Sequence, residues 1–247
     1  LQLAEAHSIA QGMHTELNSL IPSFVKRAQR NDYLVQTATG TRTLARALLS
    51  DQSISSSTPV SLVDYDQDAE DQILAAILYP HTRQPLRQLR AGVKELSVEQ
   101  RTQIFDEYIG QRRHRRDKPG RALEHGYYTF DIIGNLGLYR DLQRHRILTQ
   151  ERQDFSTVHG YDTPFEIEQA GFQSTFDHCM EQAAGLYEKL SADFPYEAQY
   201  VVPFAYRVRW YMKLNLREAI HVGELRTLPQ GHPDYRFIVQ EMWRLIG

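Results

Sequence analysis

The sequence predicts a helix-rich α+β fold, and two patterns indicate it. Most regularly spaced hydrophobic residues recur every three to four positions, as they do in amphipathic helices. Only a few short segments alternate apolar and polar residues in the manner of half-buried strands. At 247 residues, the chain can hold one large domain or one domain with an appendage.

The N-terminal segment, residues 1–50, is expected to be helical. A helical period runs over residues 3–30 and is interrupted by Pro22, and a second short helix is expected over residues 41–49. Residues 51–59 contain a serine run followed by a proline, which is typical of a linker. We therefore interpret residues 1–50 as the tail of a preceding domain. We expect a natural protein that is longer at its N-terminus and can carry two such domains.

The remainder of the chain, residues 60–247, is expected to form one domain. Alternating patterns predict strands at residues 60–65, 127–133 and 147–149. Helical spacing predicts helices over residues 68–78, 97–109, 172–190, 206–225 and 235–246. The second of these helices begins with Ser97 and Gln100, which resemble a capping box displaced by one residue.

Composition excludes several classes of protein. The net charge of −3 argues against a general nucleic-acid binder, and no apolar stretch approaches the ~20 residues of a membrane span. A single cysteine, Cys179, excludes an internal disulfide and any cysteine-rich metal site. The histidines show no metal-binding spacing such as His-Glu-x-x-His, so no metal is predicted. A cytoplasmic protein is expected.

One short motif, Arg144-His145-Arg146, is the strongest sign of a binding site. Burying a guanidinium without a partner costs several kcal/mol, so this segment does not suit a core. Arginine offers a planar fork of donors that matches phosphate oxygens. We therefore predict that both arginines line an anion-binding cleft, with His145 either orienting a neighbour or contacting the ligand. The alternative is ion pairing at an interface with Asp141, Glu151 or Asp154.

Several motifs, taken in chain order, resemble the flavin-dependent thymidylate synthases. They are Glu124-His125 followed by Thr129-Phe130, Arg144-His145-Arg146, Val202-Pro203, Leu214-x-Leu216-Arg217-x-x-x-His221 and Glu224-Leu225-Arg226. The resemblance implies a homotetramer of α+β fold that binds FAD, dUMP, NADPH and methylenetetrahydrofolate. Such an enzyme transfers the folate methylene to the uracil ring, forms dTMP, uses reduced flavin as hydride source and needs no cysteine nucleophile.

The resemblance also implies roles for individual residues. His125, Arg144, His145 and Arg146 would contact FAD, whereas Arg217 and His221 would bind the nucleotide, with Arg217 on its phosphate. Without the resemblance, His125 is better interpreted as a capping or core-edge histidine. Arg217 and His221 share a helix face, which could equally form ion pairs with Glu218 or Glu224. The basic run at residues 112–118 is typical of a solvated loop, and the alternative is contact with an anionic cofactor or partner.

Some positions depart from the family pattern. They are Asn135, Leu136, Asp141, Thr149, Glu151, Arg152, Asp154 and Met212. Glu151 and Asp154 would bring negative charge toward the expected dUMP phosphate, and like charges within about 4–6 Å reduce affinity. Two hypotheses follow: an active flavin-dependent thymidylate synthase, or a non-catalytic copy of the fold for assembly or for nucleotide or flavin binding. The second could pack against a related domain, and retention of FAD is open.

Overall fold

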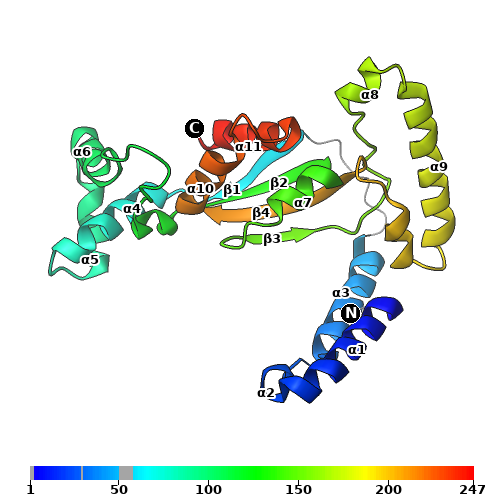
Figure 1. Cartoon of the computed structure of the whole chain (residues 1–247). Helices are drawn as coiled ribbons and strands as arrows, with labels where there is room; N and C mark the ends of the chain where they lie inside the picture. Colours follow the sequence, from blue (N-terminus) through cyan, green and yellow to red (C-terminus); the bar gives the residue numbers. More distant parts are fainter. Residues whose placement is uncertain (1–2, 29, 50–57) are drawn as a thin grey trace. The chain divides into compact units, whose positions relative to one another are not determined.

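The computed structural model describes residues 3–28, 30–49 and 58–247 (Figure 1). The predicted linker at residues 51–59 falls outside these ranges, apart from its last two residues. Two compact units are present: Leu1–Ser56 with Gly185–Val201, and Ser57–Ala184 with Val202–Gly247. Among the described residues, no helix combines the length and apolar character needed to cross a membrane.

The first unit is helical. It contains α1 (Ala4–Leu20), α2 (Pro22–Val25), α3 (Asp32–Leu49), the end of α9 (Gln173–Ser191) and the 3-10 helix η3 (Glu197–Val201). Pro22 separates α1 from α2, as predicted, because proline suits the first turn of a helix but not its interior. The next helix begins earlier than predicted, since the Asn31 side chain accepts a hydrogen bond from the Leu34 amide and caps it.

The second unit is built on a four-stranded antiparallel sheet with the order β1-β2-β4-β3 (Figure 1). Its strands are β1 (Val60–Tyr65), β2 (Tyr127–Asn135), β3 (Thr149–Arg152) and β4 (Arg207–Asn215). One face is covered by α7 (Leu136–Leu142), α10 (Leu216–Arg226) and α11 (Pro233–Ile246). The other face carries exposed side chains such as Tyr211. These elements confirm the helix-rich α+β fold.

The prediction of one helix over residues 206–225 is wrong. Its first part is β4, in which Val208, Trp210, Met212 and Leu214 are buried at every second position. The chain turns into α10 at Asn215, whose side-chain oxygen accepts a hydrogen bond from the Glu218 amide at 2.9 Å. The helical spacing of apolar residues holds in α10 and not in β4, where burial alternates.

A smaller helical layer precedes β2 in the same unit. It consists of α4 (Ala69–Leu78), η1 (Tyr79–His81), α5 (Leu86–Lys94), α6 (Val98–Ile109) and η2 (Arg121–His125). The sequence did not predict α5. The capping box of α6 is complete and in register, because Ser97 accepts from the Gln100 amide while Gln100 accepts from the Ser97 amide.

Two helices follow β3. They are α8 (Phe165–Gln169) and α9, which confirms the helix predicted over residues 172–190. Met180 is the residue that α9 buries, whereas Leu186 is exposed. Cys179 of α9 is also exposed.

Two helical glycines lead to opposite stability predictions. A Cβ added at Gly223 in α10 would lie 1.9 Å from Nε1 of Trp243 in α11, whereas a Cβ at Gly92 in α5 would meet nothing within 4 Å. We expect Gly223→Ala to lower the free energy of unfolding by about 1–3 kcal/mol through overpacking. Gly92→Ala should raise it by about 0.5–1 kcal/mol. Urea unfolding of both variants tests this, and effects of the same sign would contradict the packing.

Candidate functional site

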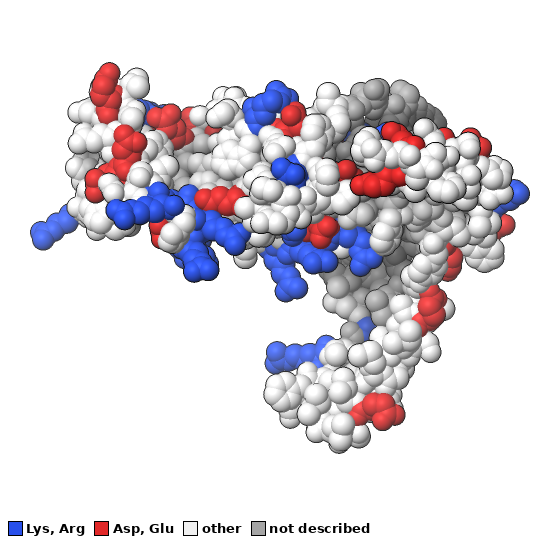
Figure 2. Space-filling view, turned by 45° about the horizontal axis from the view of Figure 1, so that its top comes forward, with Lys and Arg blue, Asp and Glu red and all other residues white. Residues whose placement is uncertain are grey.

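A cleft of about 490 Å³ lies in the second unit, between the loop after α6 and the helix α10. The loop contributes Arg115, Arg116, Lys118 and Pro119, and α10 contributes Arg217, Glu218, His221, Glu224 and Leu225. Ile147, which precedes β3, completes the lining. Figure 2 shows Lys and Arg side chains gathered on one face of the part of the molecule that carries α4–α6 and α10. The cleft is therefore bordered by positive charge.

Arg217 enters the cleft from the first turn of α10. Its Nε donates to the backbone oxygen of Pro119 and its Nη1 to Oε1 of Glu124, both at 2.9 Å. Glu124 also accepts from Arg121, and this bond, followed by the one from Arg217, lowers the pKa of the Glu124 carboxyl. Arg217 is thus held in one orientation, and its Nη2 makes no hydrogen bond to any described residue.

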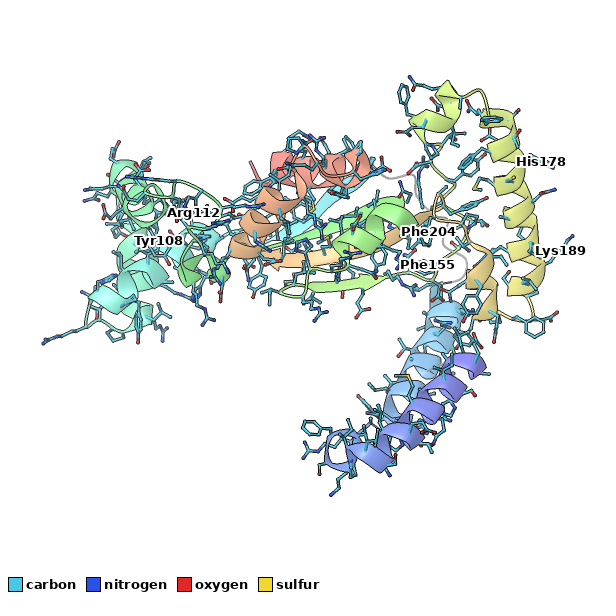
Figure 3. All side chains as sticks on the ribbon, viewed as in Figure 1. Tyr108, Arg112, Phe155, His178, Lys189 and Phe204 are labelled. Atoms are coloured by element: carbon cyan, nitrogen blue, oxygen red, sulfur yellow. The ribbon has the colours of Figure 1, made fainter. Side chains whose placement is uncertain are left out.

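The basic run at residues 112–118 is an organised wall of the cleft, not only a solvated loop. Asp117 accepts from the backbone amide of Arg113 at 3.0 Å, and this bond lowers the pKa of its carboxyl. Arg112 donates to Oε1 of Glu224 at 2.8 Å, which ties the loop to α10. Figure 3 shows Arg112 and Tyr108 at the end of α6, on its side toward α10.

His145 is buried beneath the cleft. Its Nδ1 lies 3.2 Å from Oε1 of Glu218, and its Nε2 accepts from Nε of Arg226 at 3.0 Å. The ring of His145 also meets that of His221 edge-on, with the centroids 5.8 Å apart. Within the described residues, ligand atoms of His145, Glu218 and His221 lie within 4.8 Å of one another. Sequence spacing had no signal for this group, because folding brings its members together.

Arg144 and Arg146 lie at the surface on either side of the buried His145. Both are exposed, and neither lines the cleft described above. Arg144 has a distant contact with Asp141, at 3.9 Å, and Arg146 has no ion-pair partner among the described residues. The histidine turns inward to Glu218 while its two neighbours are exposed to solvent, and a cleft lined by both arginines stays a prediction. That these arginines contact FAD stays a prediction.

The other three candidate site residues, Arg217, His221 and His125, lie in two different clefts. Arg217 and His221 line the cleft together, four residues apart on one face of α10. His125 is half-buried in η2 and lines a separate cleft of about 560 Å³ with Tyr108 and Glu124. Glu124 lines that second cleft, and its carboxylate accepts a hydrogen bond from Arg217 of the first.

Four of the eight departures from the family pattern have structural roles. The Asn135 side chain caps α7. Leu136 and Met212 are buried in the main core, which lies between the sheet and the helices α7, α10 and α11. Arg152 lies 3.9 Å over the ring of Phe155.

The acidic departures lie elsewhere than in the cleft. Glu151 is on β3 and Asp154 follows that strand. Both are exposed, and neither is among the described residues that line the cleft beside α10. The repulsion expected from the sequence therefore does not apply to a ligand in that cleft.

The contact between Arg217 and Glu124 gives a pH-dependent prediction. Because the folded pKa of Glu124 lies below its ordinary value of 4.5, the ionised form stabilises the fold above that pH, and this contribution disappears as the pH falls through the folded pKa. We expect Glu124→Gln to be less stable than the parent at neutral pH and to lose less stability between about pH 5 and pH 3. Urea unfolding at several pH values checks this, and parallel curves would contradict it.

Comparisons with known proteins identify relatives for most of the chain. Residues 61–247 match the family described as thymidylate synthase complementing protein. UPF0159 proteins of Chlamydia pneumoniae and Chlamydia muridarum are 38% and 37% identical over 98% and 97% of this chain, and the aligned region is 47% of each relative. The chain thus spans about half the length of these relatives.

One more distant relative and one solved structure of similar fold carry functional names. A flavin-dependent thymidylate synthase of Geobacter sulfurreducens is 31% identical over 136 residues, which is 51% of this chain and 58% of that protein. The crystal structure of a UMP/dUMP methylase, PolB from Streptomyces cacaoi bound with 5-Br dUMP, superimposes with a TM-score of 0.60 at 17% identity. The superposition covers 76% of this chain and 88% of the methylase chain, and it confirms the type of fold that the resemblance implied.

Proposed function

Because this chain belongs to the thymidylate synthase complementing protein family, we propose that it binds dUMP in the cleft between the basic loop and α10. The protein would methylate dUMP to dTMP with FAD, NADPH and methylenetetrahydrofolate, as the flavin-dependent members do. One observation carries the proposal: the cleft has an excess of cationic side chains beside the oriented guanidinium of Arg217.

The charge balance supports an anionic ligand. Arg115, Arg116 and Lys118 have no ion-pair partner among the described residues. Of the two acidic residues of the lining, Glu224 is paired with Arg112 at 2.8 Å, and Glu218 is buried and hydrogen-bonded to His145 at 3.2 Å. A nucleotide phosphate would therefore still meet an excess of positive groups, because only Glu218 lacks an arginine or lysine partner among the described residues.

Arg217 would contact the phosphate, and His221 would lie against the nucleotide one turn further along α10. The Nη2 group of Arg217 is not used within the described structure, so it can donate to a phosphate oxygen without breaking the contacts to Pro119 and Glu124. A guanidinium that is already oriented loses little side-chain entropy on binding.

For FAD, the surface arginines Arg144 and Arg146 fit the pyrophosphate better than His145 does. Both arginines are exposed, whereas both ring nitrogens of His145 have partners in the protein. When bound, reduced FAD supplies the hydride of the reaction. Because neither arginine lines the α10 cleft, we propose that a second copy of the chain or a related domain completes the flavin site, with His125 contributing from η2.

Three measurements test this function. Calorimetric titration with dUMP measures nucleotide binding, and the absorbance of the protein after addition of FAD measures flavin uptake. Release of label from dUMP deuterated at ring carbon 5, in the presence of NADPH and methylenetetrahydrofolate, measures turnover.

The double variant Arg115→Ala/Arg116→Ala should weaken dUMP binding, whereas Arg83→Ala/Arg87→Ala removes the same charge from outside the cleft and should not. Equal binding by both variants would contradict the placement of the site.

The second candidate function is a non-catalytic module of the same fold. It is favoured by the two bonds that already hold Arg217, because such a residue can serve as a structural bridge between α10 and the 3-10 helix η2. In that case, dUMP or FAD would bind without release of the ring-5 label.

A further inference from the structure

The bonds of His145 define how its proton is placed. Arg226 can only donate, so Nε2 of His145 must be the acceptor of their 3.0 Å hydrogen bond. The proton of the neutral ring then sits on Nδ1, where it is donated to Oε1 of Glu218 at 3.2 Å. The Arg226 guanidinium, the neutral ring of His145 and the Glu218 carboxylate thus form a hydrogen-bonded chain, in which His145 and Glu218 are buried.

The same bonds connect two helices. His145 follows α7 closely, and its backbone amide donates to the oxygen of Leu142 at the end of that helix. The two partners of its ring come from opposite ends of α10. Glu218 lies in the first turn and Arg226 in the last, and their backbones are about 12 Å apart along the helix axis. Arg226 adds a bond of 2.7 Å from Nη2 to the backbone oxygen of Asp141 in α7.

From this geometry we propose that His145 is a positioning residue for the nucleotide cleft. It bridges the two ends of α10 as the Nδ1-protonated ring, and thereby holds the face that carries Arg217 and His221 toward the basic loop. The proposal rests on the proposed function only in using dUMP affinity as one readout. It differs from the expectation that His145 contacts FAD.

The arrangement also accounts for the cluster of potential metal ligands. A metal at Nδ1 of His145 would place the ring proton on Nε2, directly against the donor of Arg226. It would also displace the hydrogen bond to Glu218. The cluster of His145, Glu218 and His221 is therefore assigned to helix positioning, and zinc should not bind there.

The first test uses the unmodified chain. Nitrogen-15 spectra of the His145 ring should show a protonated Nδ1 and an unprotonated Nε2, unchanged by dUMP, FAD or zinc. A protonated Nε2, or a large change on adding FAD or zinc, would overturn the proposal. This result does not depend on whether the chain binds dUMP.

The second test compares two substitutions of Glu218. Gln can still accept from Nδ1–H of His145, so Glu218→Gln should keep the Nδ1-protonated signature of His145 and the protection of α10 amides against hydrogen exchange, whereas Glu218→Leu should lose both. A metal ligand or a required negative charge would not be rescued by Gln, so equal loss in both variants would contradict the positioning role.

A third variant, His145→Phe, keeps an aromatic ring at this position and removes both ring nitrogens. It should weaken dUMP binding about tenfold and reduce the protection of α10 amides against hydrogen exchange. Combined with Arg217→Ala, it should give a loss smaller than the sum of the two single losses, because part of the effect of His145 acts through Arg217. If the unmodified chain binds no dUMP, the proposed function fails. Unchanged amide protection in His145→Phe would instead reject the bridge.

Discussion

Arg217→Ala is expected to lower the affinity for dUMP by about 10- to 100-fold, which is the largest functional effect of a single substitution in this chain. The guanidinium is oriented by Pro119 and Glu124, and it is the α10 cation that faces the cleft. A charge-assisted hydrogen bond to phosphate contributes about 1.5–3 kcal/mol, and alanine removes it completely. Calorimetric titration with dUMP measures the change.

Two controls separate binding from folding for this substitution. Arg217→Lys keeps the charge but not the planar fork, so it should recover only part of the affinity. Arg87→Ala removes an exposed arginine of α5 and should leave binding unchanged. Circular dichroism of all three variants checks the fold. If Arg217→Ala bound dUMP as tightly as Arg87→Ala does, the cleft beside α10 would not be the nucleotide site.

Phe130→Ala is expected to lower the free energy of unfolding by about 3–5 kcal/mol, the largest effect on stability. Phe130 is completely buried at the centre of β2, opposite Met212 of β4 and Leu62 of β1. Its ring belongs to the main core under α7 and α11, and neighbouring side chains attached to a sheet can collapse only partly into the space left behind. Urea unfolding followed by circular dichroism measures the loss.

The matched control lies on β1. Val63 is 64% exposed, so Val63→Ala removes a strand side chain that has little buried area. It should change the free energy of unfolding by about 1 kcal/mol or less. Similar losses for Phe130→Ala and Val63→Ala would contradict the position of the core between the sheet and its helices.

Local patterns predicted the parts of the fold that depend on neighbours in sequence. The strands at β1 and β2 follow from alternation, and the capping box at Ser97 follows from side chains three residues apart. The prediction was wrong where the two-residue period of a strand changes directly into the helical period, with no glycine or proline between them. At Asn215 the chain passes directly from strand to helix, so a helical spacing could be traced backwards through residues that form β4.

The candidate site was predictable only in part for the same reason. Arg217 and His221 could be placed together because a helix brings residues four apart onto one face. The basic loop beside them carried no local sign that it would meet α10, and the ion pair that joins them, Arg112 to Glu224, spans 112 residues.

By itself, the sequence determined the fold class, the family resemblance and the residues of the α10 face, because these depend on periodicity and on motifs that are read locally. Only the tertiary structure decided the direction of His145, whose partners Glu218 and Arg226 lie 73 and 81 residues away. The flanking arginines were left at the surface in consequence. A side chain turns toward the groups that satisfy its hydrogen bonds, and when those groups come from distant segments, only folding brings them within reach.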